Sequence, residues 1–206
     1  MTDWRAKLRN PFVQQYLVEI LFPLVGYFFF DWSLTVIAVF YLIDQLASET
    51  AFIRRLYKIS SSSEIRSTKI IFSAIILFVL IFLVELFFLH NSFQHIRSMT
   101  SEQLNSEIIV FAKEELWILF PLVILLYHFK DQFTFYIPRR YLQYNIRKTF
   151  TYHQIGSLIM LIIILAGFML WQISGIHDMI ILISFLVLKI VFDFSIGKWI
   201  DRKSKK

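Results

Sequence analysis

The sequence has no cysteine, few glycines and prolines, and few charged residues. The absence of cysteine excludes disulfides, thiolate metal sites and a cysteine nucleophile. Five glycines and four prolines are spread over 206 residues, and no group of glycines forms a loop that would cradle phosphate. Charged residues make up 17% of the chain, against about 25% in soluble globular domains. These shortages argue against a nucleotide-binding enzyme and against an ordinary soluble domain.

Apolar residues are abundant instead, since 57% of the chain is hydrophobic and 18% is aromatic. One soluble core cannot bury so much apolar surface, and the composition therefore indicates an integral membrane protein. The net charge is +6, but the basic residues are scattered between apolar runs rather than gathered into a groove for nucleic acid. We expect the lipid bilayer as the main partner, and no nucleic acid.

Six apolar runs are each close to the roughly 20 residues that a helix needs to cross a bilayer. They predict a single all-α transmembrane domain over residues 1–206, with spans at about 11–30, 33–52, 70–90, 108–129, 154–171 and 178–199. The first run lacks a small-residue cleavage site and is expected to be retained as a span. The fourth either contains Lys113, Glu114 and Glu115 or starts near Trp117. The cost of three adjacent charges at depth favours the start at Trp117.

Several connections carry local signals. Asp31 and Trp32 predict a tight turn after the first span, with the indole ring at the membrane interface. Thr100 followed by Gln103 predicts a capping box at the start of a helix. Residues 53–69 read as a basic, serine-rich loop, residues 130–148 as a basic segment lying along the membrane surface, and the basic tail is expected to be unstructured at its end.

The distribution of basic residues predicts the orientation of the bundle. Of the 21 lysines and arginines, three lie before the first span, five each in the second and fourth connections, and five at the C-terminal end. The three opposite connections hold only Arg97. Because basic residues collect on the cytoplasmic side, this alternation predicts a multi-pass protein of the bacterial inner (cytoplasmic) membrane with both termini in the cytoplasm.

Ionisable residues inside the predicted spans are the candidate site. Lys189 and Asp193 lie four residues apart in the last span, on one helix face. A lone lysine at that depth costs about 3 kcal/mol to insert, so we expect the two groups to be paired and turned inward. Glu19 and Asp44 also fall near the middle of the membrane by position count. Lys189 would then bridge two carboxylates if the first, second and last spans are neighbours.

The second span adds a polar stripe at helical spacing. Its members are Tyr41, Asp44, Gln45, Ser48 and Glu49. Together these residues define a candidate polar core, or a path for a proton or polar substrate, made of Glu19, Tyr41, Asp44, Glu49, Lys189 and Asp193. Two interpretations stay open: a functional path of the kind that intramembrane charges often mark, and a buried network that fixes helix packing.

Two further sets of residues lie near the predicted membrane surfaces. Lys148 and His153 fall at the inner start of the fifth span, where they would anchor the helix at the interface, touch a lipid phosphate or shuttle a proton. Glu85, Glu114, Glu115, His90 and His95 fall towards the outer side, where imidazole and carboxylate suit a transition metal. No spacing of a known metal motif supports a site there. We therefore predict no metal and no cofactor.

Short motifs make the chain similar to a family of small bacterial integral membrane proteins of unknown function. They are Pro23-Leu24-Val25-Gly26 followed by Asp31-Trp32-Ser33, then Phe40-Tyr41-Leu42-Ile43-Asp44, and finally Leu188 to Asp193, which resembles the family's Lys-x-x-x-Asp signature. The family's second motif has tryptophan where this chain has Leu42. Lys148 before His153 is a looser match. The resemblance implies that Asp44, Lys189 and Asp193 are positions to test, and it implies no activity.

Three classes of function remain open from the sequence. The first and favoured class is a non-catalytic scaffold or accessory subunit, whose polar core fixes packing or binds a membrane-protein partner or a second copy. The second is a small proton-coupled transporter that uses Glu19, Asp44, Lys189 and Asp193. The third is an intramembrane enzyme acting on lipid, with His153 working with Asp44 or the outer glutamates.

Overall fold

The computed structural model describes residues 21–63, 67–96, 100–174 and 178–205, although the side chains of 92–96 and of most residues from 164 to 196 lie outside that description. The described part is helical and contains no named strand. Residues 21–29 are helical, and the α-helices that follow are α3 (Leu34–Ser62), α4 (Thr68–Ile96), α5 (Ser101–Phe111), α6 (Trp117–Asp131), α7 (Ile146–Ser174) and α8 (Asp178–Ser204). The all-α prediction is thus confirmed for the described residues.

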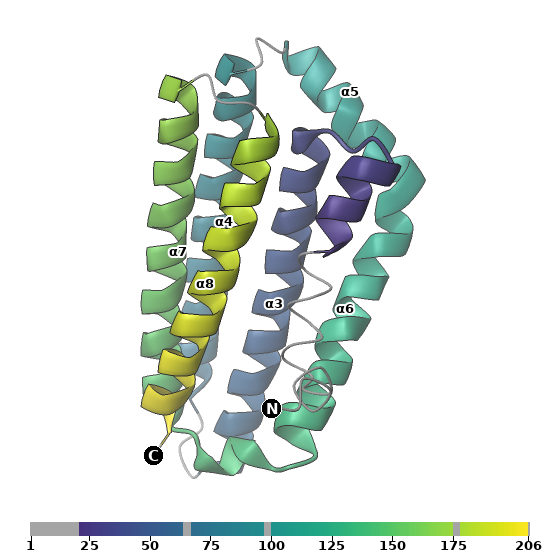
Figure 1. Ribbon diagram of the computed structural model, residues 1–206. Helices are drawn as coiled ribbons and strands as arrows, with labels where there is room; N and C mark the ends of the chain where they lie inside the picture. Colours follow the sequence, from purple (N-terminus) through teal and green to yellow (C-terminus); the bar gives the residue numbers. More distant parts are fainter. Residues whose placement is uncertain (1–20, 64–66, 97–99, 175–177, 206) are drawn as a thin grey trace, which may run out of the picture.

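Helix α3 is the central element of the bundle. It packs against α4, α5, α6 and α7, while α8 packs on α7 (Figure 1). Its inner face supplies a core that includes Ile37, Phe40 and Ala47, and this core is shared with Leu119 and Val123 of α6. A second apolar cluster lies at the other end of α3, around Leu56 and Ile59. The helix with the polar stripe is therefore the helix that most of the others surround.

The turn before α3 forms as predicted, but it buries its tryptophan. Asp31 has a left-handed φ of 51°, and Ser33 caps α3 by accepting a hydrogen bond from the amide of Val36 at 3.3 Å. The Trp32 ring is only 6% exposed and packs in the core rather than at an interface. It lies so close to Gly26 that a Cβ there would be 2.2 Å from the ring. Glycine is needed at this position because any side chain would displace the indole.

The fourth predicted span is built from several consecutive helical segments. The capping box of Thr100 and Gln103 is present and starts α5, as predicted. The chain then continues through a π-helical turn, Ala112–Leu116, into α6, which begins at Trp117. A second π-helical turn, Gln132–Tyr136, follows α6 and leads into a short 3₁₀ helix, Arg140–Gln143.

Two segments that the sequence suggested were irregular are helical. Helix α3 continues to Ser62, so most of the expected loop after 52 is helix, because Leu56 and Ile59 bury their side chains completely while the charged residues take other faces. Helix α8 continues to Ser204, so the basic tail is helical from 201 to 204, and its last residue, Lys206, lies outside the described residues. Between α6 and α7, the segment expected along the membrane surface contains the π-helical turn Gln132–Tyr136 and the 3₁₀ helix Arg140–Gln143.

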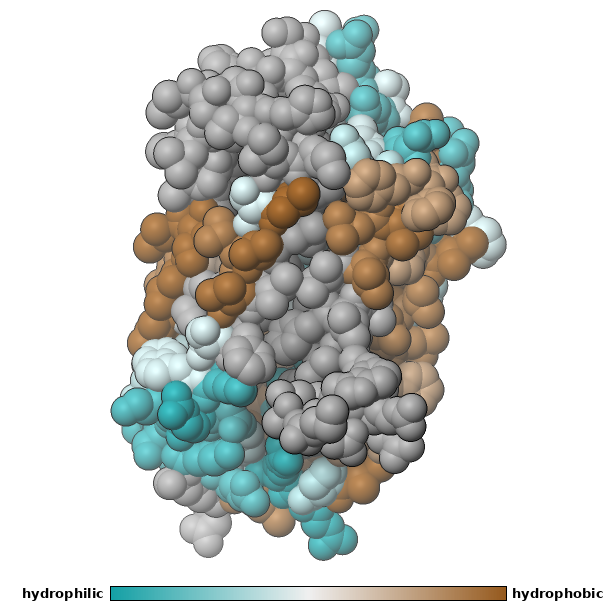
Figure 2. Space-filling view, viewed as in Figure 1, coloured by the Kyte–Doolittle hydropathy of each residue, from teal (hydrophilic) through white to brown (hydrophobic). Residues whose placement is uncertain are grey.

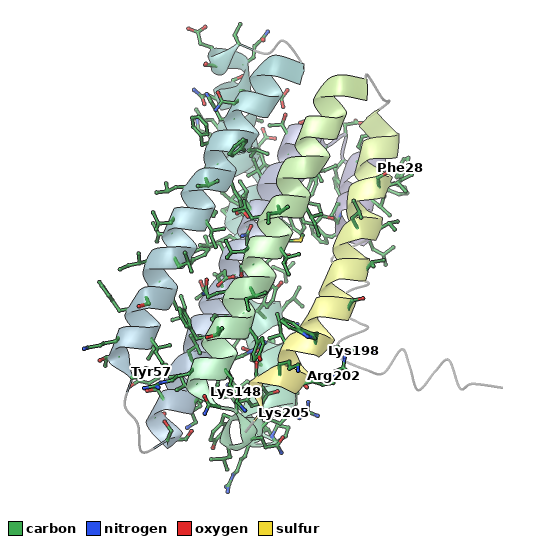
Figure 3. All side chains as sticks on the ribbon, turned by 90° about the vertical axis from the view of Figure 1, so that its left-hand side faces the viewer. Phe28, Tyr57, Lys148, Lys198, Arg202 and Lys205 are labelled. Atoms are coloured by element: carbon green, nitrogen blue, oxygen red, sulfur yellow. The ribbon has the colours of Figure 1, made fainter. Side chains whose placement is uncertain are left out.

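Two of the described helices are long and apolar enough to cross a membrane by length and composition. They are Thr35–Ser62 within α3 and Thr68–Asn91 within α4. Figure 2 shows apolar surface in a band between two more hydrophilic ends. Figure 3 shows that Lys148, Lys198, Arg202 and Lys205 gather at one end of the bundle, whereas Phe28 lies towards the other. We call the end with these cations the basic end.

Candidate functional site

The polar stripe of α3 is divided among the surrounding helices. Asp44 is 5% exposed, and the Tyr127 hydroxyl of α6 donates a hydrogen bond to its Oδ1 at 3.1 Å. Gln45, the next residue, points to α4, where its Nε2 donates to Glu85 Oε1 at 3.1 Å. Glu49, one turn further on, meets α7. Since successive residues of a helix are turned by about 100°, one short segment reaches three neighbours.

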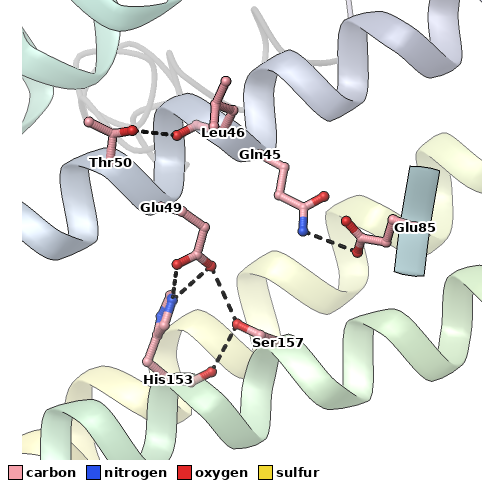
Figure 4. A network of polar contacts seen from close by, with 7 residues as sticks. All are labelled: Gln45, Leu46, Glu49, Thr50, Glu85, His153 and Ser157. Carbon is pink, nitrogen blue, oxygen red and sulfur yellow. Dashed lines mark hydrogen bonds and ion pairs between the residues drawn. The ribbon is translucent and has the colours of Figure 1, made fainter. Parts of the chain in front are cut away.

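Glu49 binds His153 with both carboxylate oxygens (Figure 4). The imidazole Nε2 lies 2.9 Å from Oε1 and 3.0 Å from Oε2. A carboxylate can only accept, so Nε2 carries the proton in this contact. The Ser157 hydroxyl lies one turn along α7, 3.4 Å from Glu49 Oε1 and 3.2 Å from the backbone oxygen of His153. Its single proton can serve one of these acceptors or be shared between them.

The His153 ring is further held by stacking. It lies flat on Phe52 of α3, with ring centroids 3.4 Å apart and planes inclined by 16°. The side chains of His153 and Glu49 are 20% and 12% exposed. The predicted interfacial residue is therefore packed between α3 and α7, where its proton-carrying nitrogen faces a carboxylate.

A second set of pairs ties α3 to the chain around the end of α6. Arg55 Nε donates to Asp131 Oδ2 at 2.9 Å, and its Nη2 contacts Asp131 Oδ1, giving a two-pronged ion pair. Asp131 is 1% exposed. Arg54 contacts His128 Nδ1 at 3.2 Å. At the opposite end of α3, the Ser33 hydroxyl donates to Glu107 Oε2 of α5 at 2.9 Å.

The basic end carries its own cluster, here called the C-terminal clasp and made of Tyr144, Asp201 and Lys205. The Tyr144 hydroxyl donates to Asp201 Oδ1, and Lys205 Nζ donates to Asp201 Oδ2 at 2.9 Å. Burial raises the pKa of Asp201, but the hydrogen bonds from Tyr144 and Lys205 outweigh it and leave that pKa below its usual value. Burial and the adjacent carboxylate raise the pKa of Tyr144.

The residues proposed from the sequence thus have different outcomes. Tyr41 is buried in the core beside Phe40, and Asp44 and Glu49 bind different helices. Lys148 is exposed, and its Nζ lies 3.4 Å from the backbone oxygen of Lys205. Glu19 lies outside the described residues, and so do the side chains of Lys189 and Asp193 on α8. Whether those three groups join Asp44 and Glu49 stays a prediction.

Some polar residues of the core were not recognised as such from the sequence. Glu85 was placed towards the outer side by position count, but it is 5% exposed and level with the middle of α3 through Gln45. A lone acid in an apolar run was the available signal. Asp131 and Tyr127 gave no such signal. Within the described part of the chain, no group of three or more histidines and acids is arranged to hold a metal ion.

The chain matches no protein-family model, and no curated protein or solved structure is significantly similar to it. The interpretation of the polar core therefore depends on its geometry.

Proposed function

We propose that the chain is a six-span protein of the bacterial cytoplasmic membrane. The large apolar side chains on the outside of the bundle support this. On α4, Phe72, Leu80, Leu83 and Phe87 are each more than half exposed, and Ile162 of α7 is equally open. Soluble proteins rarely expose continuous apolar surface beyond a few hundred Å². Acyl chains are the solvent that such a surface suits, and lipid is the first partner that we propose.

The proposed orientation places the basic end in the cytoplasm, with both termini there. The end of α3, the start of α7 and the end of α8 meet at this end, and each brings basic residues (Figures 1 and 3). They are separated by long stretches of sequence, so the gathering is not a local composition effect. Each basic residue near an anionic leaflet contributes about 1 kcal/mol of attraction.

Within that membrane setting, we propose a non-catalytic scaffold or accessory subunit. One observation carries this: each of Asp44, Gln45 and Glu49 on the central helix binds a different neighbouring helix. In lipid, polar groups that hydrogen-bond across helices hold them together. The polar core therefore holds the helices of the bundle together. The outer apolar faces remain for lipid, a membrane-protein partner or a second copy.

The two alternatives differ in their support. The enzyme that pairs His153 with Asp44 is not favoured, because His153 binds Glu49 towards α7 whereas Asp44 binds Tyr127 towards α6. The proton-coupled carrier has one specific observation in its favour. Glu85 Oε2 is buried without a hydrogen-bond partner among the described residues, and a group of this kind can gain and lose a proton.

The membrane topology can be tested directly because the chain has no cysteine to remove. Single variants Ser61→Cys, Asn105→Cys and Lys203→Cys place a thiol at exposed sites on the proposed inner, outer and inner sides. A membrane-impermeant maleimide applied to intact bacterial cells freed of their outer membrane should label only Asn105→Cys. Permeabilised cells should show all three. Labelling of Ser61→Cys in intact cells would overturn the proposed topology.

The scaffold and the carrier are separated by proton flux. Purified full-length protein in vesicles with an internal pH dye should show no proton uptake above that of empty vesicles when a potassium diffusion potential is imposed. Uptake that Glu85→Gln abolishes and the exposed Glu114→Gln retains would replace the scaffold by the carrier.

A further inference from the structure

Glu85 is the one ionisable residue in the apolar stretch of α4 from 70 to 89. Its carboxyl group is buried between α4 and α3, with the residue 5% exposed. Oε1 accepts one hydrogen bond, from Gln45 Nε2 at 3.1 Å. Oε2 is buried and finds no partner among the described residues. Only one of the two carboxyl oxygens accepts a hydrogen bond, and a buried oxygen without a partner is costly.

The surroundings of Glu85 carry a neighbouring negative charge. On α3, Glu49 lies one turn from Gln45 on the same face and acts on Glu85 electrostatically. On α7, the titratable group is His153, which is already hydrogen-bonded to Glu49. On α5, Glu107 accepts from Ser33. No described cation is bonded to Glu85, whose hydrogen-bond partner is the uncharged amide of Gln45, and the Lys189 side chain of α8 lies outside the described residues.

We propose that Glu85 is a proton-binding site, occupied at neutral pH, in which the carboxyl group is held as a neutral acid against the Gln45 carboxamide. Uptake of one proton from water converts the carboxylate to the acid, and the new O–H bond forms on Oε2. The orphaned acceptor becomes a donor. A carboxamide offers both a donor and an acceptor, so Gln45 has the groups to hydrogen-bond the carboxyl in either protonation state.

The assignment of the proton follows from how the two nearby acids are bonded. Both oxygens of Glu49 face the proton-carrying nitrogen of His153, and the Ser157 hydroxyl is a second donor near this carboxylate. Glu85 has one amide donor. When two carboxyl groups lie close together, ionisation of both at once is unfavourable. The less solvated of the two then keeps its proton. The bound proton would make the contact between α3 and α4 sensitive to pH, which a purely structural core would not be.

Infrared spectroscopy on the full-length protein in lipid nanodiscs tests the site. The wild type should show the C=O band of a protonated carboxylic acid at neutral pH, and the band should shift in D₂O. It should disappear in Glu85→Gln and remain in the exposed Glu114→Gln. Labelling glutamate with ¹³C at the side-chain carboxyl should shift the band and exclude an aspartic acid. Absence of the band in the wild type, or its survival in Glu85→Gln, would overturn the proposal.

A second variant keeps the test open if Glu85→Gln does not fold. Gln45→Leu removes the amide partner and leaves the acid, so the band should move to higher frequency while remaining present.

A sodium ion is the alternative occupant of the site, and thermal unfolding tests for it. If NaCl, but not choline chloride at equal ionic strength, raises the unfolding temperature of the wild type and leaves Glu85→Gln unchanged, a sodium ion occupies the site and the proton assignment fails. The infrared result is independent of proton flux, so this site and the scaffold proposal can fail separately.

Discussion

Helices α3 and α4 are adjacent and equally long, but they distribute their side chains in opposite ways. The apolar window of α4 is the more hydrophobic of the two, yet 17% of it is buried inside the bundle, against 50% for α3. In a protein folded in water, the more apolar helix would lie deeper. The inversion is what a lipid environment produces. A leucine side chain is as favourable against acyl chains as inside the protein. Polar groups, in contrast, must turn towards the protein to find hydrogen-bond partners.

The same comparison explains how the two helices are held. Helix α3 uses polar bonds in several directions, to Tyr127, Glu85 and His153. Helix α4 meets α3 through the hydrogen bond that Glu85 accepts from Gln45. Substitutions in α3 should therefore destabilise the bundle by removing hydrogen-bond partners. Substitutions in α4 should act mainly by changing how this helix interacts with the proposed bilayer. The predictions below separate these two modes, from the largest expected effect to the smallest.

Asp131→Ala should lower the free energy of unfolding in detergent by about 3 to 5 kcal/mol, because it leaves the Arg55 guanidinium without its carboxylate in a buried setting. Chemical denaturation of the purified protein measures the change. The double variant Arg55→Met with Asp131→Leu should recover much of the loss, since it removes both charges. A single variant as stable as the wild type would show that the pair does not hold α3.

Leu56→Ala should cost about 3 kcal/mol, because this α3 side chain is 0% exposed and its removal leaves a cavity. The matched variant on α4 is Leu83→Ala, whose side chain is 55% exposed. It should change the free energy of unfolding by less than about 0.5 kcal/mol. Equal losses in the two variants would remove the contrast between the helices.

Leu83→Arg should cost about 2.5 kcal/mol of membrane insertion, because in the proposed membrane arrangement it places a cation among acyl chains near the middle of α4. The fraction of protein recovered in the membrane measures this. Ser61→Arg, at an exposed site on the basic end, is the control and should leave the fraction unchanged. If Leu83→Arg is as well tolerated as the control, the outer face of α4 meets water.

The C-terminal clasp should make a small, pH-dependent contribution. Because the pKa of Asp201 is lowered in the folded protein, its bonds to Tyr144 and Lys205 add stability above the unfolded-state pKa and lose it as the pH falls through the folded-state value. The loss should stay below about 1 kcal/mol, since the Asp201 side chain is 42% exposed and screened by water. Unfolding temperatures from neutral pH to below about pH 4 should converge for the wild type and Asp201→Asn. A constant gap would contradict the lowered pKa.

Much of the local structure could be predicted because its causes are local. The capping box at Thr100 needs only two residues, and the turn at Asp31 needs only its neighbours. The extension of α3 to Ser62 could not be predicted in this way. Arg54, Arg55 and Lys58 made that segment look like a surface loop, whereas the burial of Leu56 comes from a cluster that includes Phe135 and Ile146.

The candidate site was predictable as a stripe and not as a set of bonds. Helical periodicity placed Asp44, Gln45 and Glu49 on one side of a helix. It did not indicate that the three side chains bind three different helices, or that Glu85 would meet Gln45. Position counts along the spans used predicted ends at 52 and 90, but α3 and α4 continue to Ser62 and Ile96, and Glu85 is thereby level with Gln45.

By itself, the sequence determined that the chain forms apolar helices with a few isolated charges. Helix formation and the cost of placing a charge in lipid both depend on residues within one segment. The tertiary structure alone decided which charges meet. A side chain's partner depends on how neighbouring helices are rotated and shifted. Those positions are determined by packing between residues as far apart in the chain as Glu49 and His153.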